Sequence, residues 1–276
     1  MTLDALYLAA VVACTVASLV GFAAWFWKGS PALQRWGAWL GIASLIVTFW
    51  TWTQRWYVAG HLPIFGTHES ALSLAVAVLA SSLIIRRKEL WPVTTAVAAL
   101  LLVHGRGFMS TPLPLTISER SWVVDVHAVV AWAAFGCLAV NAALALSKLV
   151  GRPKHSEATN RLLSFTLSAG FALHTGMLAS GSIYKFLLFG QTWSFDPIET
   201  LGFVAWIAYG TLLHLHLMAG WDGARLAKWC LPLFLLLAVS YRSIVYFPAW
   251  STYHIFDLDL RLHINPADVP SSRGGS

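Results

Sequence analysis

The chain has 276 residues, of which 58% are hydrophobic and only 11% are charged, and its mean hydropathy is +0.67. Soluble domains carry roughly a quarter charged residues, so this composition excludes an ordinary soluble protein and indicates a polytopic membrane protein. The formal net charge of +6 is therefore interpreted as an excess of basic residues in cytoplasmic loops, and not as a surface for nucleic acid.

The apolar runs predict an all-α bundle of about eight membrane-spanning helices, because each run is close to the roughly 20 residues that a spanning helix needs. The first run lacks a basic start and contains Asp4, so we interpret it as an anchor and not as a cleaved signal peptide. We expect one transmembrane domain over residues 1–256, followed by a short polar tail, 257–276, that is disordered. The predicted spans are residues 3–27, 34–53, 68–85, 90–105, 122–147, 162–188, 200–218 and 228–247.

Basic residues gather in alternate loops, namely those after the first, third, fifth and seventh runs. Because cytoplasmic loops are enriched in Lys and Arg, this pattern predicts that these four loops are cytoplasmic. Both termini and the loops at 54–67, 106–121 and 189–199 are then expected on the outer side. The basic residues in question are Lys28, Arg35, Arg86, Arg87, Lys88, Lys148, Arg152, Lys154, Arg161, Arg225 and Lys228.

Histidines gather at or near the predicted outer face: His61, His68, His104, His127 and His254. Neutral imidazole is a common metal ligand, and two imidazoles from different segments could hold an iron porphyrin from its two faces. His127 and His254 are the best candidates because they flank residues 190–203 in sequence and share the same side. The alternative for each is a hydrogen bond to lipid headgroups or loop carbonyls.

Three further histidines lie within predicted spans. His174 is near the middle of the sixth span, where we expect a neighbouring helix to satisfy its imidazole by hydrogen bonding. His214 and His216 are two residues apart on the seventh span, so they face different sides of the helix and do not address one ligand together.

The segment GQTWSFDPIETLGF, residues 190–203, is the most unusual outer loop. Asp196 is predicted to cap the seventh helix, with Pro197 at the first helical position and Glu199 at the third, as in a variant of the capping box. Capping does not explain Trp193 and Phe195. Those aromatic residues are either interface anchors or a stacking platform for a flat, apolar ligand.

This segment resembles the tryptophan-rich WWD signature of haem-handling proteins of cytochrome c biogenesis, of the CcsA/ResC type. The upstream RWYVAGHLPIFGTHESALSLA and SWVVDVHAVVAWAAFG also resemble elements of that family, and the resemblance covers about residues 50–257. Departures are Phe195 in place of the second Trp, Ile198 in place of a usual Lys, Leu201 in place of a usual Trp, and His174 at an apolar position. The matching residues of the signature are Gly190, Trp193, Asp196, Pro197, Glu199, Thr200, Trp206 and His214.

The resemblance implies a membrane protein that binds b-type haem non-covalently and presents it at the outer face for thioether attachment to apocytochrome c CxxCH sites, as the membrane part of a synthase. His127 and His254 would be axial ligands of a haem lying against residues 190–203, while His214 would be one ligand of a second haem within the membrane. Candidate contacts for the haem propionates are Arg55, Arg106, Arg120 and Arg242.

Implied partners are a CcsB/ResB-like membrane protein and apocytochrome c, with a thiol-reducing protein as a further candidate. The implied location is a bacterial inner membrane or a thylakoid. Two alternatives stay open. The chain could be a divergent haem-b subunit for electron transfer or haem-linked regulation, or a transporter without cofactor, although the inverted repeats common in transporters are not evident.

Overall fold

The computed structural model describes residues 2–27, 30–108, 115, 120–151 and 157–246, with side chains described as far as Arg242. In that part of the chain every regular element is helical, which confirms the predicted all-α fold. The helices match the predicted apolar runs to within six residues at each end, with the largest difference at the end of the second helix. They are α1 (Leu3–Phe26), α2 (Pro31–Ala59), α3 (Gly66–Ile85), the short 3-10 helix η1 (Lys88–Leu90), α4 (Trp91–Arg106), α5 (Trp122–Leu149), α6 (Glu157–Phe189), α7 (Pro197–Ala219) and α8 (Gly223–Tyr246).

Polar side chains fix several helix starts. The first N–H groups of a helix have no partner within it, and a side-chain oxygen at the capping position accepts from one of them. Ser30 accepts from the N–H of Leu33 at 3.2 Å before α2, and Ser121 accepts from Val123 at 3.3 Å before α5. The α2 helix ends at Gly60, whose φ of 73° is the left-handed conformation that glycine adopts without strain.

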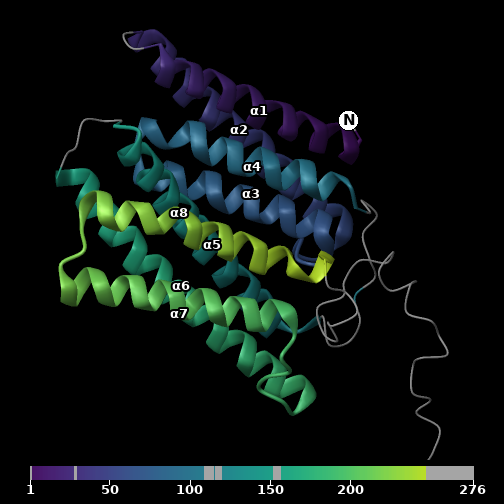
Figure 1. Ribbon diagram of the computed structural model, residues 1–276. Coiled ribbons are helices and arrows are strands. Elements are labelled where there is room, and N and C mark those ends of the chain that lie inside the picture. Colours follow the sequence, from purple (N-terminus) through teal and green to yellow (C-terminus); the bar gives the residue numbers. More distant parts are fainter. Residues whose placement is uncertain (1, 28–29, 109–114, 116–119, 152–156, 247–276) are drawn as a thin grey trace, which may run out of the picture.

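The helices form a layered bundle, shown in Figure 1. The α1, α2, α3 and α4 helices make one group, in which α1 packs against α2 and α4, and α3 packs against α4. The α5 helix lies at the centre and contacts α3, α6 and α8. The α6 and α7 helices lie on the opposite side from α1 and α2, and α7 also packs against α8.

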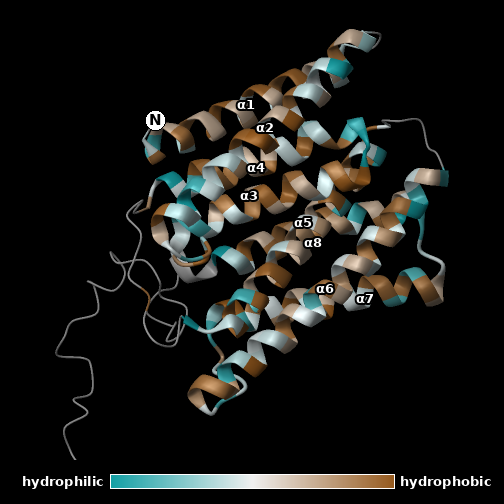
Figure 2. Cartoon of the chain, turned by 180° about the vertical axis from the view of Figure 1, so that it is seen from behind, coloured by the Kyte–Doolittle hydropathy of each residue, from teal (hydrophilic) through white to brown (hydrophobic). Residues whose placement is uncertain are grey.

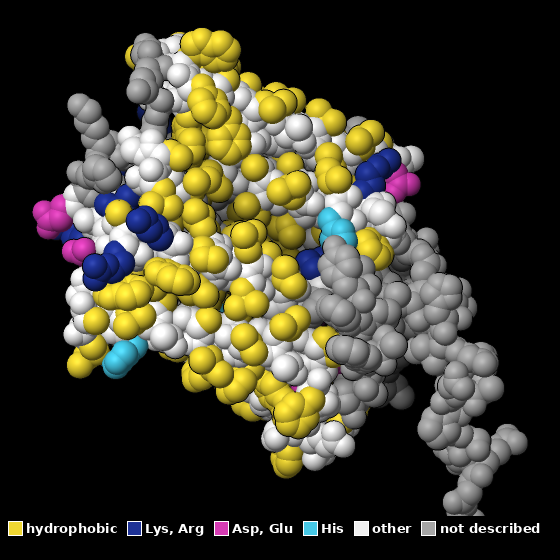
Figure 3. Space-filling model, in the orientation of Figure 1, with side chains coloured by type: hydrophobic (Ala, Val, Ile, Leu, Met, Phe, Trp, Pro, Cys, Tyr) yellow, Lys and Arg dark blue, Asp and Glu magenta, His cyan; other side chains and the backbone are white. Residues whose placement is uncertain are grey.

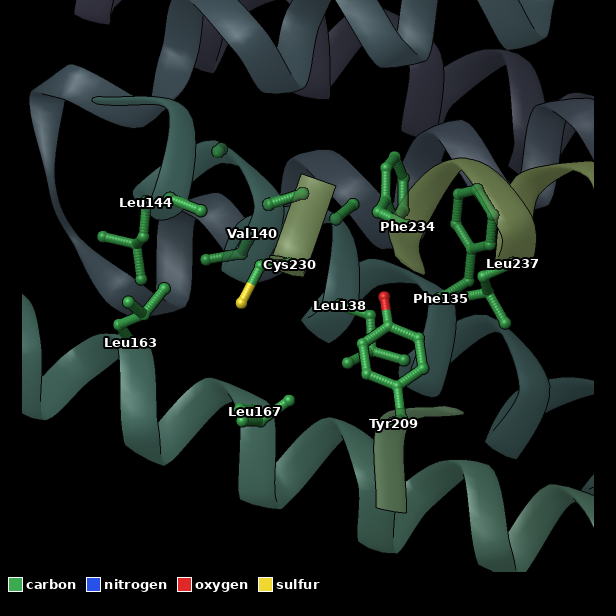
Figure 4. Packing of buried hydrophobic residues seen from close by; sticks show 14 of the residues in the cluster. Phe135, Leu138, Val140, Leu144, Leu163, Leu167, Tyr209, Cys230, Phe234 and Leu237 are labelled. Atoms are coloured by element: carbon green, nitrogen blue, oxygen red, sulfur yellow. The ribbon is translucent and has the colours of Figure 1, made fainter. Parts of the chain in front are cut away.

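The main hydrophobic core lies where α5 meets α6, α7 and α8. Figure 4 shows Phe135 and Leu138 of α5 facing Tyr209 of α7 and Phe234 of α8. Close approach of α5 to α3 depends on Gly136, because a Cβ at this position would lie 2.6 Å from the Ala77 carbonyl oxygen. A second core cluster, among α1, α2, α3 and α4, includes Tyr7, Leu72, Trp91 and Leu102.

The surface is that of a membrane protein. Figure 2 shows apolar residues around the helices over most of their length, and Figure 3 shows Lys and Arg side chains gathered at the end of the bundle where α6 and α8 begin. Six described helices are long and apolar enough to cross a membrane: α1, α3, α5, α6, α7 and Gly223–Arg242 of α8. The α2 and α4 helices lie outside that set, so the number of eight spans and the sidedness of the termini stay predictions.

Candidate functional site

A cleft opens at the end of the bundle where α5 begins and α6 ends, with an empty volume of about 1490 Å³ that includes open solvent. Residues from α3, α5, α6, α7 and α8 line it, together with the loop between α6 and α7. The lining is mostly apolar, and a few polar side chains converge on it. The lining residues whose side chains could bind a ligand are His127, Tyr184, Lys185, Trp193, Glu199, Ser240, Tyr241 and Arg242.

His127 is placed in the cleft by the second turn of α5. Its Nδ1 lies 3.0 Å from the Met177 carbonyl oxygen of α6 and 3.3 Å from Oγ of Ser180. A carbonyl oxygen only accepts hydrogen bonds, so the contact with Met177 assigns the proton to Nδ1. In neutral imidazole the lone pair is then on Nε2, the nitrogen with which such a histidine ligates a metal.

The two acidic residues of the 190–203 segment, Asp196 and Glu199, form hydrogen bonds that fix this loop beside the cleft. Asp196 is buried and caps α7, accepting from the N–H of Ile198 at 3.1 Å, as expected from the sequence. In a capping box the Glu199 carboxylate would accept from the N–H of Asp196, but here it accepts from a residue earlier in the chain. Its Oε2 accepts from the N–H of Ser194 at 2.9 Å, while its Oε1 pairs with Nζ of Lys185. Asp196 and Glu199 therefore shape the loop and join it to α6.

The two aromatic residues of the segment have different surroundings. Trp193 lines the cleft and lies edge-on to Phe203 at a centroid distance of 5.7 Å. Phe203 stacks in turn on Trp206 of α7 at 5.6 Å, so Trp193 begins a row of packed rings along the helix. Phe195 is 80% exposed, is not among the cleft-lining residues, and has a positive φ of 59°. The structure thus brings Trp193, but not Phe195, to the cleft.

Among the residues that the structure describes, two cationic side chains line the cleft. Arg242 of α8 donates from Nη1 to Oγ of Ser70 at 3.2 Å and is 9% exposed. Lys185 of α6 lies on the wall formed with Glu199. Because both are held by neighbouring side chains, their charges have fixed positions in a largely apolar surrounding, where electrostatic interactions are stronger than in water.

The other predicted arginines lie elsewhere. Arg55 of α2 is buried in an ion pair with Glu69 of α3, with Nε 2.8 Å from Oε1, and it does not line the cleft. Glu69 also accepts from the N–H of Phe65 at 3.1 Å, and Phe65 does line the cleft. Arg55 is thus connected to the cleft lining through Glu69 and Phe65. Arg106 and Arg120 are exposed and are not cleft-lining residues.

His174, His214 and His216 do not line the cleft. His214 is exposed on α7, and Nδ1 of His216 lies 2.6 Å from the Trp221 carbonyl oxygen, which ties it to the next loop. His174 is fully buried, with Nε2 3.1 Å from the Gly202 carbonyl oxygen of α7, so a neighbouring helix accepts its hydrogen bond as expected. His254 lies outside the described residues.

Lys185 and Gly181 are cleft residues that the sequence analysis did not identify. A signal was present, because His174, Met177, Leu178, Gly181 and Lys185 are spaced so as to share one face of a helix. A lysine inside an apolar run is itself unusual, and intramembrane ionisable residues commonly face a cavity or a partner.

Comparison with known proteins adds three similarities. A CcsA cytochrome c biogenesis protein of Prochlorococcus marinus (strain MIT 9215) is 26% identical over 270 residues, covering 82% of this chain and 85% of the relative. Another, from Synechococcus sp. (strain CC9311), is 28% identical over 223 residues, covering 62% of this chain and 72% of the relative. The solved structure of the cytochrome c haem lyase CcmF has the same fold over 96% of this chain, with a TM-score of 0.65 and 16% identity.

This chain spans 52% of the length of that lyase chain, so the two share a helical core and differ in extent. The family described as "Cytochrome C assembly protein" matches residues 9–247, which include every described residue of the cleft. The match covers most of the chain and confirms the family that the sequence resembles. The chain is therefore a divergent, CcsA-like member of the cytochrome c assembly protein family.

Proposed function

We propose that this protein works in cytochrome c biogenesis, where it binds haem in the cleft as a non-covalent b-type cargo and presents it for attachment to apocytochrome c. The observation that carries the proposal is His127, whose Nδ1 is held by the Met177 carbonyl in a cleft that also contains Trp193. Membership of the cytochrome c assembly family supports the same conclusion.

The residues of the cleft fit the chemistry of haem. Haem presents a flat apolar ring, an iron that takes an imidazole, and two carboxylates. Trp193 offers a flat face, Nε2 of His127 a lone pair, and Arg242 and Lys185 positive charges. The lining is mostly apolar with a few convergent polar groups, which is typical of sites that bind cofactors and other small molecules.

Two further histidines complete the proposal. Ser240, Tyr241 and Arg242 line the cleft, and His254 follows them in sequence, so we propose that His254 would be a second ligand to the iron of the cleft haem. His214 is exposed on α7, as expected of a ligand to a second haem that is shared with a CcsB/ResB-like partner.

The haem supplies two vinyl groups, to which the two thiols of a CxxCH site add to form thioethers. The protein's own residues position the ring and protect the iron. His127 would hold the iron, Trp193 would pack against the macrocycle, and Arg242 would pair with a propionate through a charge-assisted hydrogen bond. The thiols come from the apocytochrome, kept reduced by a separate thiol-reducing protein. The cleft opens on the extracytoplasmic face.

The absorption spectrum of the purified protein tests this proposal. Protein from haem-replete cells is expected to show a Soret band, and His127→Ala and His254→Ala are each expected to reduce haem bound in the cleft. His214→Ala is the control that leaves cleft haem in place. Absence of a Soret band from correctly folded protein would contradict the proposal, and equal losses in all three variants would point to a single shared site.

Deletion of the protein separates assembly from electron transfer. If the protein presents haem for attachment, cells without it lose covalent haem from their cytochromes c, which haem staining after denaturing electrophoresis measures. A deletion strain with intact cytochromes c but altered quinol oxidation would instead identify a haem-b subunit.

A further inference from the structure

The α6 backbone approaches the ring of His127 at Gly181. A Cβ at this position would lie 2.8 Å from Cε1 and 3.1 Å from Nδ1 of His127. Heavy atoms do not approach a Cβ to less than 3.0 Å, so any side chain at 181 displaces the imidazole or pushes α6 away from α5. Both glycine and histidine line the cleft. The absence of a side chain at 181 is therefore what allows the ring to occupy its place.

One turn earlier, α6 supplies the hydrogen-bond acceptor. Nδ1 of His127 lies 3.0 Å from the Met177 carbonyl oxygen, which also accepts from Oγ of Ser180 at 3.0 Å. Residues 177, 180 and 181 lie on adjoining turns of one helix face, so a single rigid element sets the position of the ring and the location of its proton. The α5 helix supplies the histidine, and α6 supplies its surroundings.

We propose that Gly181 is a positioning residue for the haem iron ligand. By allowing His127 to lie against the α6 backbone, it secures the hydrogen bond from Nδ1 to Met177 and directs Nε2 toward the ligand in the cleft. This inference rests on the proposed function, because it assumes that His127 ligates iron. A ligating histidine whose other nitrogen donates to a carbonyl has a fixed tautomer and greater basicity at the ligating nitrogen.

The main test is Gly181→Ala in the full-length protein. Outer partners of a ligating histidine are commonly worth 10- to 100-fold in affinity, so haem retention in the cleft is expected to fall by roughly that factor. The haem that remains is expected to shift from a six-coordinate, low-spin spectrum to a five-coordinate, high-spin one. Added imidazole, which replaces the displaced ring, is expected to restore the low-spin spectrum.

Gly176→Ala is the matched control on the same helix. A Cβ at 176 would meet its nearest neighbour, Cγ1 of Val130, at 3.5 Å, an ordinary contact. Gly176→Ala thus removes the backbone freedom of a glycine from the same helix but adds no contact with His127. Its haem spectrum and thermal unfolding are expected to match those of the wild type. Equal spectral changes in Gly176→Ala and Gly181→Ala would overturn the proposal, because they would report general loosening of α6.

A third comparison keeps the test informative if Gly181→Ala does not fold. In a His127→Gly background the ring is absent, so Gly181→Ala is expected to add no further loss of thermal stability. If the double variant is as poorly folded as Gly181→Ala alone, the clash lies elsewhere and the proposal fails.

His127→Gly alone separates this proposal from the proposed function. If His127→Gly keeps the wild-type haem spectrum, His127 is no iron ligand and both proposals fall. If His127→Gly loses the low-spin spectrum but Gly181→Ala retains it, only the positioning role of Gly181 is refuted.

Discussion

Trp193 and Phe195 are two residues apart, yet their surroundings differ. Trp193 is half-buried, lines the cleft and packs against Phe203. Phe195 is 80% exposed and has a φ of 59°, a conformation that costs a bulky L-residue roughly 1–2 kcal/mol. The sequence pattern places both rings in one motif, but only the backbone conformation at 195 shows that the two point to different places.

We therefore expect substitutions at Trp193 and Phe195 to have different effects on haem content. Trp193→Ala removes a ring from the cleft and is expected to lower haem content. Phe195→Gly replaces an exposed ring by the residue best suited to a positive φ, so the free energy of unfolding is expected to stay within about 1 kcal/mol of the wild type. Haem content per folded protein, from absorption and quantitative amino-acid analysis, measures the difference. A comparable loss of haem in both variants would assign Phe195 to the ligand after all.

At the scale of helices, the α2–α3 connection depends on a buried ion pair. Arg55 and Glu69 are 3% and 1% exposed, and Glu69 also holds the N–H of Phe65 at the start of α3. Removing one partner of a buried ion pair leaves an uncompensated charge and costs about 3–5 kcal/mol. The pair thus supports the cleft lining through Phe65, in the chain segment that leads into α3.

This arrangement predicts the behaviour of Arg55 variants. Arg55→Met is expected to lower the thermal stability strongly and to lower haem content with it. Adding Glu69→Gln removes the stranded charge and keeps an oxygen that accepts from Phe65, so the double variant is expected to recover most of the stability and the haem. Thermal unfolding in detergent and haem content are measured together. A stable double variant that lacks haem would show that Arg55 contacts the ligand itself.

The positions of the helices could be predicted from apolar runs because burial in lipid requires long, internally hydrogen-bonded segments. The Asp196 cap could also be predicted, since capping depends on residues within a few positions of each other. The composition of the cleft could not, because it depends on which faces of α5, α6 and α8 meet. Gly181 is one of several glycines within apolar runs of the sequence. Its role follows from its contact with the ring of His127, which lies 54 positions earlier in the chain.

For the whole molecule, the distribution of basic loops predicts which end faces outward. The loop that contains Thr192 borders the cleft, and Asp222 lies in the link between α7 and α8 at the opposite end of α7. Both side chains are exposed, so a cysteine at either position is accessible to a reagent on its own side of the membrane. Among the native thiols, Cys14 and Cys230 are buried and Cys137 is half-buried, so their background labelling is expected to be low.

A membrane-impermeant maleimide applied to intact cells is therefore expected to label Thr192→Cys and to leave Asp222→Cys unlabelled until the membrane is permeabilised. The physical reason is the excess of Lys and Arg in the loops at the Asp222 end, which favours their retention on the cytoplasmic side. The two variants control for each other, since each must react after permeabilisation. The reverse order of labelling would place the cleft on the cytoplasmic side, where thiols of exported apocytochromes could not reach a haem held by His127.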